Sequence, residues 1–145
     1  MAPGDRPVRV LVVDDTASVR QLIRVNLELD GYEVHEAVDG QDCLDRIGAL
    51  APDLVTIDVV MPRLDGYATV ASLRADPATA SVPVVMVTTQ VQAGDLRRAA
   101  EVGVDAHVGK PFDPDALLAT VQQVLATRAA KPLPDGDGRA DTLGR

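Results

Sequence analysis

The sequence has very few aromatic residues and a single cysteine. It contains no tryptophan, two tyrosines and one phenylalanine, while hydrophobic residues make up 46% of the chain, so its core must be built from aliphatic side chains. Cys43 alone cannot form an internal disulfide or a thiolate metal cluster, and its helical surroundings favour a half-buried structural thiol. No apolar run approaches the roughly 18 residues of a membrane span, and the amino terminus lacks the apolar segment of a signal peptide. We therefore expect a cytoplasmic protein without a membrane partner.

Basic residues are also scarce, and only two of them, Lys110 and Lys131, are lysines. The formal net charge is −8, and the acidic and basic residues after Arg128 cancel, so the acidic excess belongs to the preceding part. Such a charge argues against a nucleic-acid partner and favours a cationic partner or a bound cation.

The chain alternates short β-branched runs with longer helical patterns, and its 145 residues suit one domain. Strands are expected at 8–13, 32–37, in the run that leads into Asp58, at 83–88 and at 104–109. Helices are expected at 18–30, 40–49, 67–74, 93–102 and from 114 onward. The pattern predicts an α/β fold with a doubly wound, five-stranded parallel sheet and five helices, in which the more polar second strand lies at an edge. The domain spans 8–128, between an N-terminal extension (1–7) and a flexible C-terminal tail (129–145).

Polar residues follow four of the expected strands. They are Asp14, Asp15, Asp58, Thr88 and Lys110. Each has an ordinary explanation alone: a solvated turn or helix cap for the acids, strand propensity for the threonine, and a surface loop for the lysine. In doubly wound sheets, however, ligands sit beyond the carboxyl ends of the strands, so these residues are expected to meet.

Three crowded carboxylates repel one another unless a cation joins them. Mg²⁺ is suited because it takes oxygen ligands and keeps several waters, and Mn²⁺ is a substitute. The metal and Lys110 would together balance the three negative charges. Asp58, alone at its strand end, is the natural nucleophile for phosphoryl transfer, with Thr88 and Lys110 stabilising the transferred group.

These motifs resemble those of a stand-alone response-regulator receiver domain of the chemotaxis-regulator type, over Val8 to about Arg128. They are Val-Val-Asp14-Asp15, Ile57-Asp58-Val59-Val60-Met61-Pro62 with Asp65-Gly66, Val87-Thr88 and Lys110-Pro111-Phe112. The resemblance implies a flavodoxin-like sheet of order 2-1-3-4-5 and a cis peptide between Lys110 and Pro111.

The resemblance also implies a role for each matching residue. Asp58 would be the phosphoacceptor; Asp14, Asp15, Asp58 and the backbone carbonyl of Val60 would hold the metal; Thr88 and Lys110 would contact the phosphoryl group. His107 occupies a switch position that is commonly aromatic in the family. A packed, neutral histidine is the ordinary explanation, and we expect this side chain also to serve as the switch. Val60 and Gln90 flank the path of the hydrolytic water, and the apolar Val60 predicts slow loss of the phosphoryl group.

The function implied is that of a phosphoacceptor in a two-component system or phosphorelay, and not a conventional turnover enzyme. A sensor histidine kinase or histidine phosphotransfer protein would phosphorylate Asp58, and this would switch the face formed by the fourth helix, fifth strand and fifth helix for a downstream protein. One alternative is a non-phosphorylated scaffold on the same fold. Another is a haloacid-dehalogenase-type phosphatase, which would need a second acid where Val60 stands.

Overall fold

The computed structural model describes residues 6–130, which form one parallel sheet with helices on both faces. The strands are β1 (Arg9–Val13), β2 (Glu33–Ala37), β3 (Leu54–Ile57), β4 (Val84–Thr88) and β5 (Ala106–Gly109). Neighbouring strands all pair in parallel, in the order β2-β1-β3-β4-β5. The predicted sheet and its strand order are confirmed.

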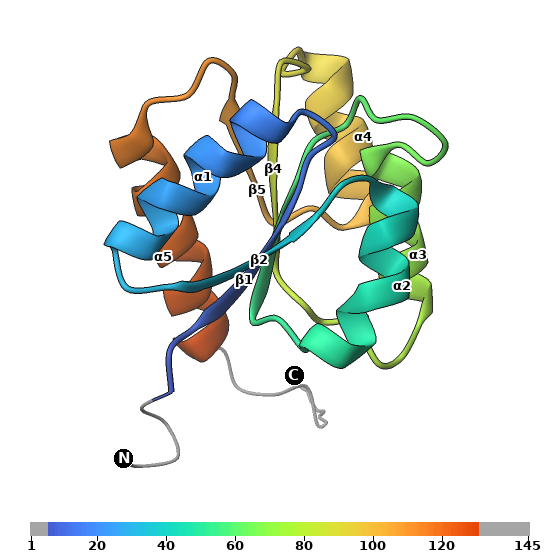
Figure 1. The fold of residues 1–145 in the computed structure, drawn as a ribbon. Coiled ribbons are helices and arrows are strands. Elements are labelled where there is room, and N and C mark those ends of the chain that lie inside the picture. Colours follow the sequence, from blue (N-terminus) through green and yellow to red (C-terminus); the bar gives the residue numbers. More distant parts are fainter. Residues whose placement is uncertain (1–5, 131–145) are drawn as a thin grey trace.

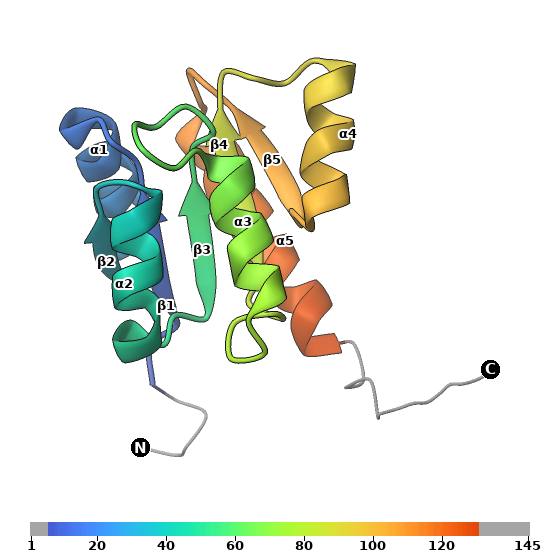
Figure 2. The same ribbon diagram turned by 90° about the vertical axis from the view of Figure 1, so that its right-hand side faces the viewer.

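The helices alternate with the strands and lie in two layers. They are α1 (Ala17–Leu29), α2 (Gly40–Leu50), α3 (Gly66–Ala75), α4 (Ala93–Val102) and α5 (Pro114–Ala130). Helices α1 and α5 cover one face of the sheet, and α2, α3 and α4 cover the other (Figure 1). The perpendicular view shows α2, α3 and α4 in a row in front of the strands (Figure 2). Among these helices, none is both long and apolar enough to cross a bilayer.

The sheet is buried on both faces, which explains its continuous aliphatic strands. In β1, Val10 and Val12 belong to the apolar cluster formed with α1 and α5, whereas Leu11 and Val13 belong to the cluster formed with α2, α3 and α4. This alternation follows from the two-residue period of a strand. Cys43 of α2 is fully buried rather than half-buried, because α2 packs directly on the sheet, and burial raises the pKa of its thiol to about 12.

The start of α3 packs against the end of β3. The Asp65 side chain caps α3 by accepting a hydrogen bond of 2.8 Å from the amide of Ala68. The next residue, Gly66, approaches the Asp58 backbone so closely that a Cβ atom there would lie 2.3 Å from the Asp58 carbonyl oxygen. Only glycine fits at this point, so α3 and the end of β3 are positioned against each other.

The predicted element boundaries lie within about two residues of those observed. Helix α5 runs to Ala130, two residues into the stretch predicted as a tail, and residues 131–145 lie outside the described part. Of the predicted N-terminal extension, residues 1–5 also lie outside it. Arg6 is described, and its guanidinium donates two hydrogen bonds, of 2.9 and 3.0 Å, to the Asp53 carboxylate.

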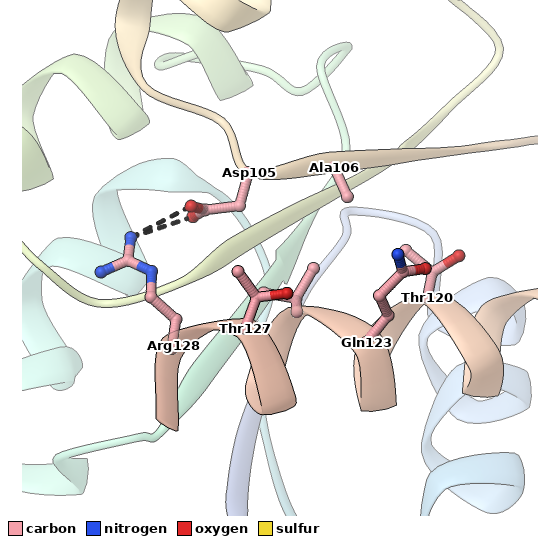
Figure 3. Close-up of a pocket in the computed structure, with 7 residues that line it drawn as sticks. Asp105, Ala106, Thr120, Gln123, Thr127 and Arg128 are labelled. Carbon is pink, nitrogen blue, oxygen red and sulfur yellow. Dashed lines mark hydrogen bonds and ion pairs between the residues drawn. The ribbon is translucent and has the colours of Figure 1, made fainter. Parts of the chain in front are cut away.

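The two edges of the sheet differ in character. Strand β2 lies at one edge, as its polarity predicts, and carries Glu33, His35 and Glu36. Strand β5 lies at the other edge and is four residues long. Just before β5, the Asp105 carboxylate binds Arg128 of α5 at 3.1 Å (Figure 3). It also binds Arg74 of α3 at 3.3 Å. Asp105 therefore joins the ends of both α3 and α5 to the start of β5.

Candidate functional site

The predicted acidic residues meet because β1 and β3 are neighbours. Val13 lies opposite Ile57 in the parallel register, so the residues that follow, Asp14 and Asp58, emerge side by side. Asp14 is 1% exposed and Asp58 is 8% exposed, whereas Asp15 faces solvent. Asp14, Asp15 and Asp58 each place a carboxylate oxygen within 4.8 Å of the others.

Lys110 reaches this acidic group from the end of β5. Its ammonium lies 2.8 Å from Asp14 Oδ2 and 2.9 Å from Asp58 Oδ2. Burial acts to lower the pKa of Lys110, but the hydrogen bonds to the two carboxylates outweigh it and the pKa is raised. The bond between Lys110 and Pro111 is cis, as expected, and the Lys110 amide donates to the Thr88 carbonyl at 2.9 Å.

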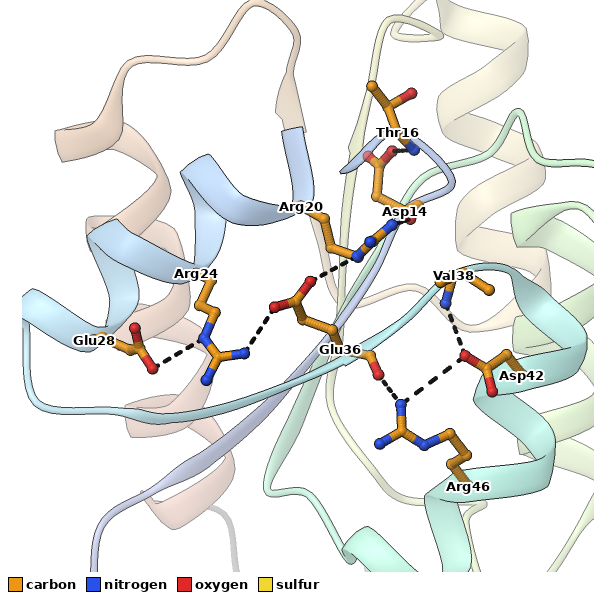
Figure 4. Close-up of polar contacts among 9 residues, drawn as sticks. All are labelled: Asp14, Thr16, Arg20, Arg24, Glu28, Glu36, Val38, Asp42 and Arg46. Atoms are coloured by element: carbon orange, nitrogen blue, oxygen red, sulfur yellow. Dashed lines mark hydrogen bonds and ion pairs between the residues drawn. The ribbon is translucent and has the colours of Figure 1, made fainter. Parts of the chain in front are cut away.

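The backbone of Asp14 is held by a residue that sequence reasoning did not single out. Arg20 of α1 donates to the Asp14 carbonyl oxygen at 2.9 Å and to Glu36 Oε1 of β2 at 2.7 Å (Figure 4). The sequence offered little signal for this contact, since Arg20 looks like an ordinary polar residue of an amphipathic helix.

Thr88 and His107 lie on the neighbouring strands β4 and β5. Thr88 is fully buried, and its hydroxyl oxygen accepts a hydrogen bond of 3.1 Å from the Gln90 amide. His107 lies opposite Met86 in the sheet, and its Nε2 atom is buried without a hydrogen-bond partner among the described residues. Burial lowers the pKa of His107, so the ring is neutral at neutral pH.

Val60 and Gln90 share a hollow of about 270 Å³ along the loop that follows Asp58. Its lining also includes Val59, Tyr67 and Arg98, whose guanidinium carbon lies 4.3 Å from the Tyr67 ring centre. Val60 is 57% exposed, so it forms part of the open surface there.

The acidic residues suit a hard divalent cation. Carboxylate oxygens from three side chains converge, two of the residues are nearly buried, and one is open to solvent, which leaves room for metal-bound water. Mg²⁺ and Mn²⁺ both prefer such oxygen ligands.

The family of the response regulator receiver domain matches residues 10–122. This chain belongs to that family. Similar receiver-containing proteins include the DNA-binding dual master transcriptional regulator RpaA of Synechocystis, 38% identical over 81% of this chain and 48% of RpaA. The response regulator MprA of Mycolicibacterium vanbaalenii is 37% identical over 94% of this chain and 57% of its own length. The chain thus spans about half the length of these relatives.

Solved structures show the same receiver fold. The chemotaxis protein CheY4 of Vibrio cholerae is 34% identical with a TM-score of 0.79, covering 82% of this chain and 99% of that one. The receiver domain of Francisella response regulator 1452 is 28% identical with a TM-score of 0.78, covering 85% of this chain and 99% of that one. The receiver family also argues against the dehalogenase-type phosphatase, in agreement with the apolar Val60.

Proposed function

We propose that Asp58 of this receiver domain accepts a phosphoryl group from the phosphohistidine of a sensor histidine kinase or a histidine phosphotransfer protein. The observation that carries the proposal is the contact of Lys110 with Asp14 and Asp58, inside a group of three carboxylates. A scaffold that is never phosphorylated has no need of this costly arrangement of charges. The proposal implies a cytoplasmic protein that works through protein partners, and the acidic chain gives no support to a nucleic-acid contact by this domain.

In the proposed step, a carboxylate oxygen of Asp58 forms a bond to phosphorus while the bond from phosphorus to the partner's imidazole nitrogen breaks. The imidazole keeps the electron pair and takes up a proton. Lys110, 2.9 Å from Asp58 Oδ2, is placed to contact the oxygens of the arriving phosphoryl group. Asp14, Asp15, Asp58 and the Val60 carbonyl would hold Mg²⁺, which when bound neutralises charge on the phosphoryl oxygens.

A small phosphodonor such as phosphoramidate tests this assignment without the kinase. With Mg²⁺ present, the intact mass should rise by one phosphoryl group in the parent and in Asp45→Asn, a control on the exposed side of α2. Asp58→Asn should show no rise, and a rise that persists in this variant would refute the assignment. A parent that binds Mg²⁺ but never gains mass would favour the scaffold.

We further propose that phosphorylation switches the face formed by α4, β5 and α5. The Thr88 hydroxyl would turn toward the phosphoryl oxygens, and His107 would move into the vacated space. Two observations support this. The His107 Nε2 atom is buried without a hydrogen-bond partner among residues 6–130, and an unpaired buried polar atom costs free energy. Strand β5, which carries His107, lies beside β4, which carries Thr88. A hollow of about 290 Å³ between β5 and α5, lined by Ala106, Gln123 and Thr127 among others, offers a downstream protein a place to bind (Figure 3).

Amide exchange in α4 and β5, measured with and without phosphodonor, tests the switch. Exchange should change in the parent and stay constant in Asp58→Asn. Identical exchange in the phosphorylated and unphosphorylated parent would exclude the switch while leaving phosphorylation itself intact.

A further inference from the structure

We propose that Arg20 is a positioning residue for the acidic site, because it fixes the peptide unit that joins Asp14 to Asp15. This inference rests on the proposed function, since it concerns the residues that would hold the metal. The contact in question is the hydrogen bond of 2.9 Å from Arg20 Nη1 to the Asp14 carbonyl oxygen.

Asp14 is held at every polar atom. Its amide donates to the Ala37 carbonyl at 3.3 Å, its Oδ1 accepts from the Thr16 amide at 2.9 Å, and its Oδ2 accepts from Lys110 at 2.8 Å. The contact with Arg20 completes this set at the carbonyl oxygen. These contacts come from β2, from α1 and its N-cap residue, and from Lys110 just after β5, so Asp14 has a single well-defined orientation.

Asp15, in contrast, faces solvent. The peptide unit between Asp14 and Asp15 is planar, so the direction of the Asp14 carbonyl also sets the direction in which the chain enters Asp15. A hydrogen bond that fixes this carbonyl therefore limits where the Asp15 carboxylate can point. Arg20 acts on Asp15 through the backbone, without touching its side chain.

Arg20 is itself firmly held. Its Nε donates to Glu36 Oε1 at 2.7 Å, and its side chain is only 15% exposed. Arg24, one turn later on α1, binds the other oxygen of Glu36 at 2.7 Å and Glu28 at 3.0 Å (Figure 4). The hydrogen bond from Arg24 lowers the pKa of Glu36. Burial acts to raise this pKa, but the hydrogen bond from Arg20 also lowers it, so the carboxylate stays charged at neutral pH. The planar guanidinium of Arg20 can bridge Glu36 and the Asp14 carbonyl at once, whereas an ammonium cannot match this fork.

Charge and geometry predict opposite effects for Arg20 on metal binding. A positive charge near the site would repel a divalent cation, so loss of the charge alone would strengthen Mg²⁺ binding. Loss of the hydrogen bond would weaken it, because Asp15 would have to be ordered when the metal binds. Arg24 provides a matched control, since it lies on the same helix and shares Glu36 but does not contact Asp14.

Calorimetric titration of the unphosphorylated protein with MgCl₂ tests the proposal without relying on activity. Arg20→Ala should weaken Mg²⁺ binding about tenfold, the lower end of what outer-shell partners contribute to metal affinity. Arg20→Lys, which keeps the charge, should also weaken it, and Arg24→Ala should leave it unchanged. Circular dichroism confirms folding of each variant, and Arg20→Lys carries the test alone if Arg20→Ala does not fold.

Four results would overturn the proposal. Tighter binding by Arg20→Ala with parent-like binding by Arg20→Lys would show that Arg20 acts only as a charge. Equal weakening by Arg20→Ala and Arg24→Ala would show that only the ion-pair network as a whole matters. Parent-like binding by Arg20→Ala would overturn this inference alone, whereas a parent that binds no Mg²⁺ would overturn the proposed function together with it.

Discussion

Replacement of Lys110 by methionine should destabilise the metal-free protein, because it removes the cation from the acidic group while keeping an apolar stem of similar length. The Lys110 side chain is 15% exposed, and the side chains of Asp14 and Asp58 that it binds are 1% and 11% exposed. Removing one partner of a fully buried ion pair costs about 3–5 kcal/mol. Since this site opens to solvent at Asp15, we expect a loss of about 2–3 kcal/mol in the free energy of unfolding.

Urea unfolding near neutral pH with a chelator, followed by far-ultraviolet circular dichroism, measures this loss. Folding raises the pKa of Lys110, so the stability that its charge contributes is fully present below pH 10.5, its ordinary pKa. This stability is lost only as pH rises through the folded-state pKa. An assay near neutral pH therefore measures the whole contribution. In an Asp58→Asn background the same change should cost at least about 1 kcal/mol less, because one of the two charge contacts is already gone.

Mg²⁺ should restore stability to Lys110→Met by about 2.7 kcal/mol at a hundredfold excess over its dissociation constant. Arg97→Met, which removes an exposed cation from α4, serves as the control and should stay within about 0.5 kcal/mol of the parent. If Lys110→Met also stays within that range, Lys110 does not offset the carboxylate repulsion and the electrostatic reasoning fails.

Three further predictions concern hydrolysis, pH dependence and thiol reactivity. Val60→Asn should speed loss of the phosphoryl group about tenfold at fixed Mg²⁺, because an amide can orient the attacking water; an equal or slower rate would show that Val60 does not limit access. Burial lowers the pKa of His107, so as pH falls below 6.5 the unfolded state takes up the proton first and the free energy of unfolding drops, by at most about 1.4 kcal/mol per pH unit. His107→Gln should lack this part of the decrease in stability with falling pH. The same decrease in the parent and in His107→Gln would contradict the prediction. Cys43, buried and with its pKa raised to about 12, should react with Ellman's reagent only in denaturant, and fast labelling of the folded protein would show that the thiol is accessible.

The sequence predicted that Asp14, Asp58 and Lys110 would come together, because they are polar residues at strand ends. Lys110 is one of two lysines, and in a parallel sheet any residue that follows a strand lies at the same edge as Asp14 and Asp58. Periodicity alone could not decide which strands are neighbours. That order came from the family resemblance and is confirmed by the sheet.

Contacts between long side chains could not be predicted in this way. The bridge from Arg20 to Glu36 spans 16 residues and depends on the rotamers of both side chains and on the distance between α1 and β2. The full burial of Cys43 was also missed, because the amphipathic pattern of α2 shows which side faces inward but not how closely the helix approaches the sheet. Such details depend on packing, which a one-dimensional pattern does not contain.

The charged edge strand β2 has a consequence for how the protein behaves at high concentration. An open sheet presents unpaired backbone groups at its outer strands, and these can recruit a strand from another molecule and begin aggregation. Along β2, Glu33 and Glu36 are engaged by Arg9 and Arg20, so an added strand would have to pack beside fixed charges and disturb these ion pairs. The arginine that we assign to the acidic site therefore also helps to keep the sheet from growing beyond its five strands.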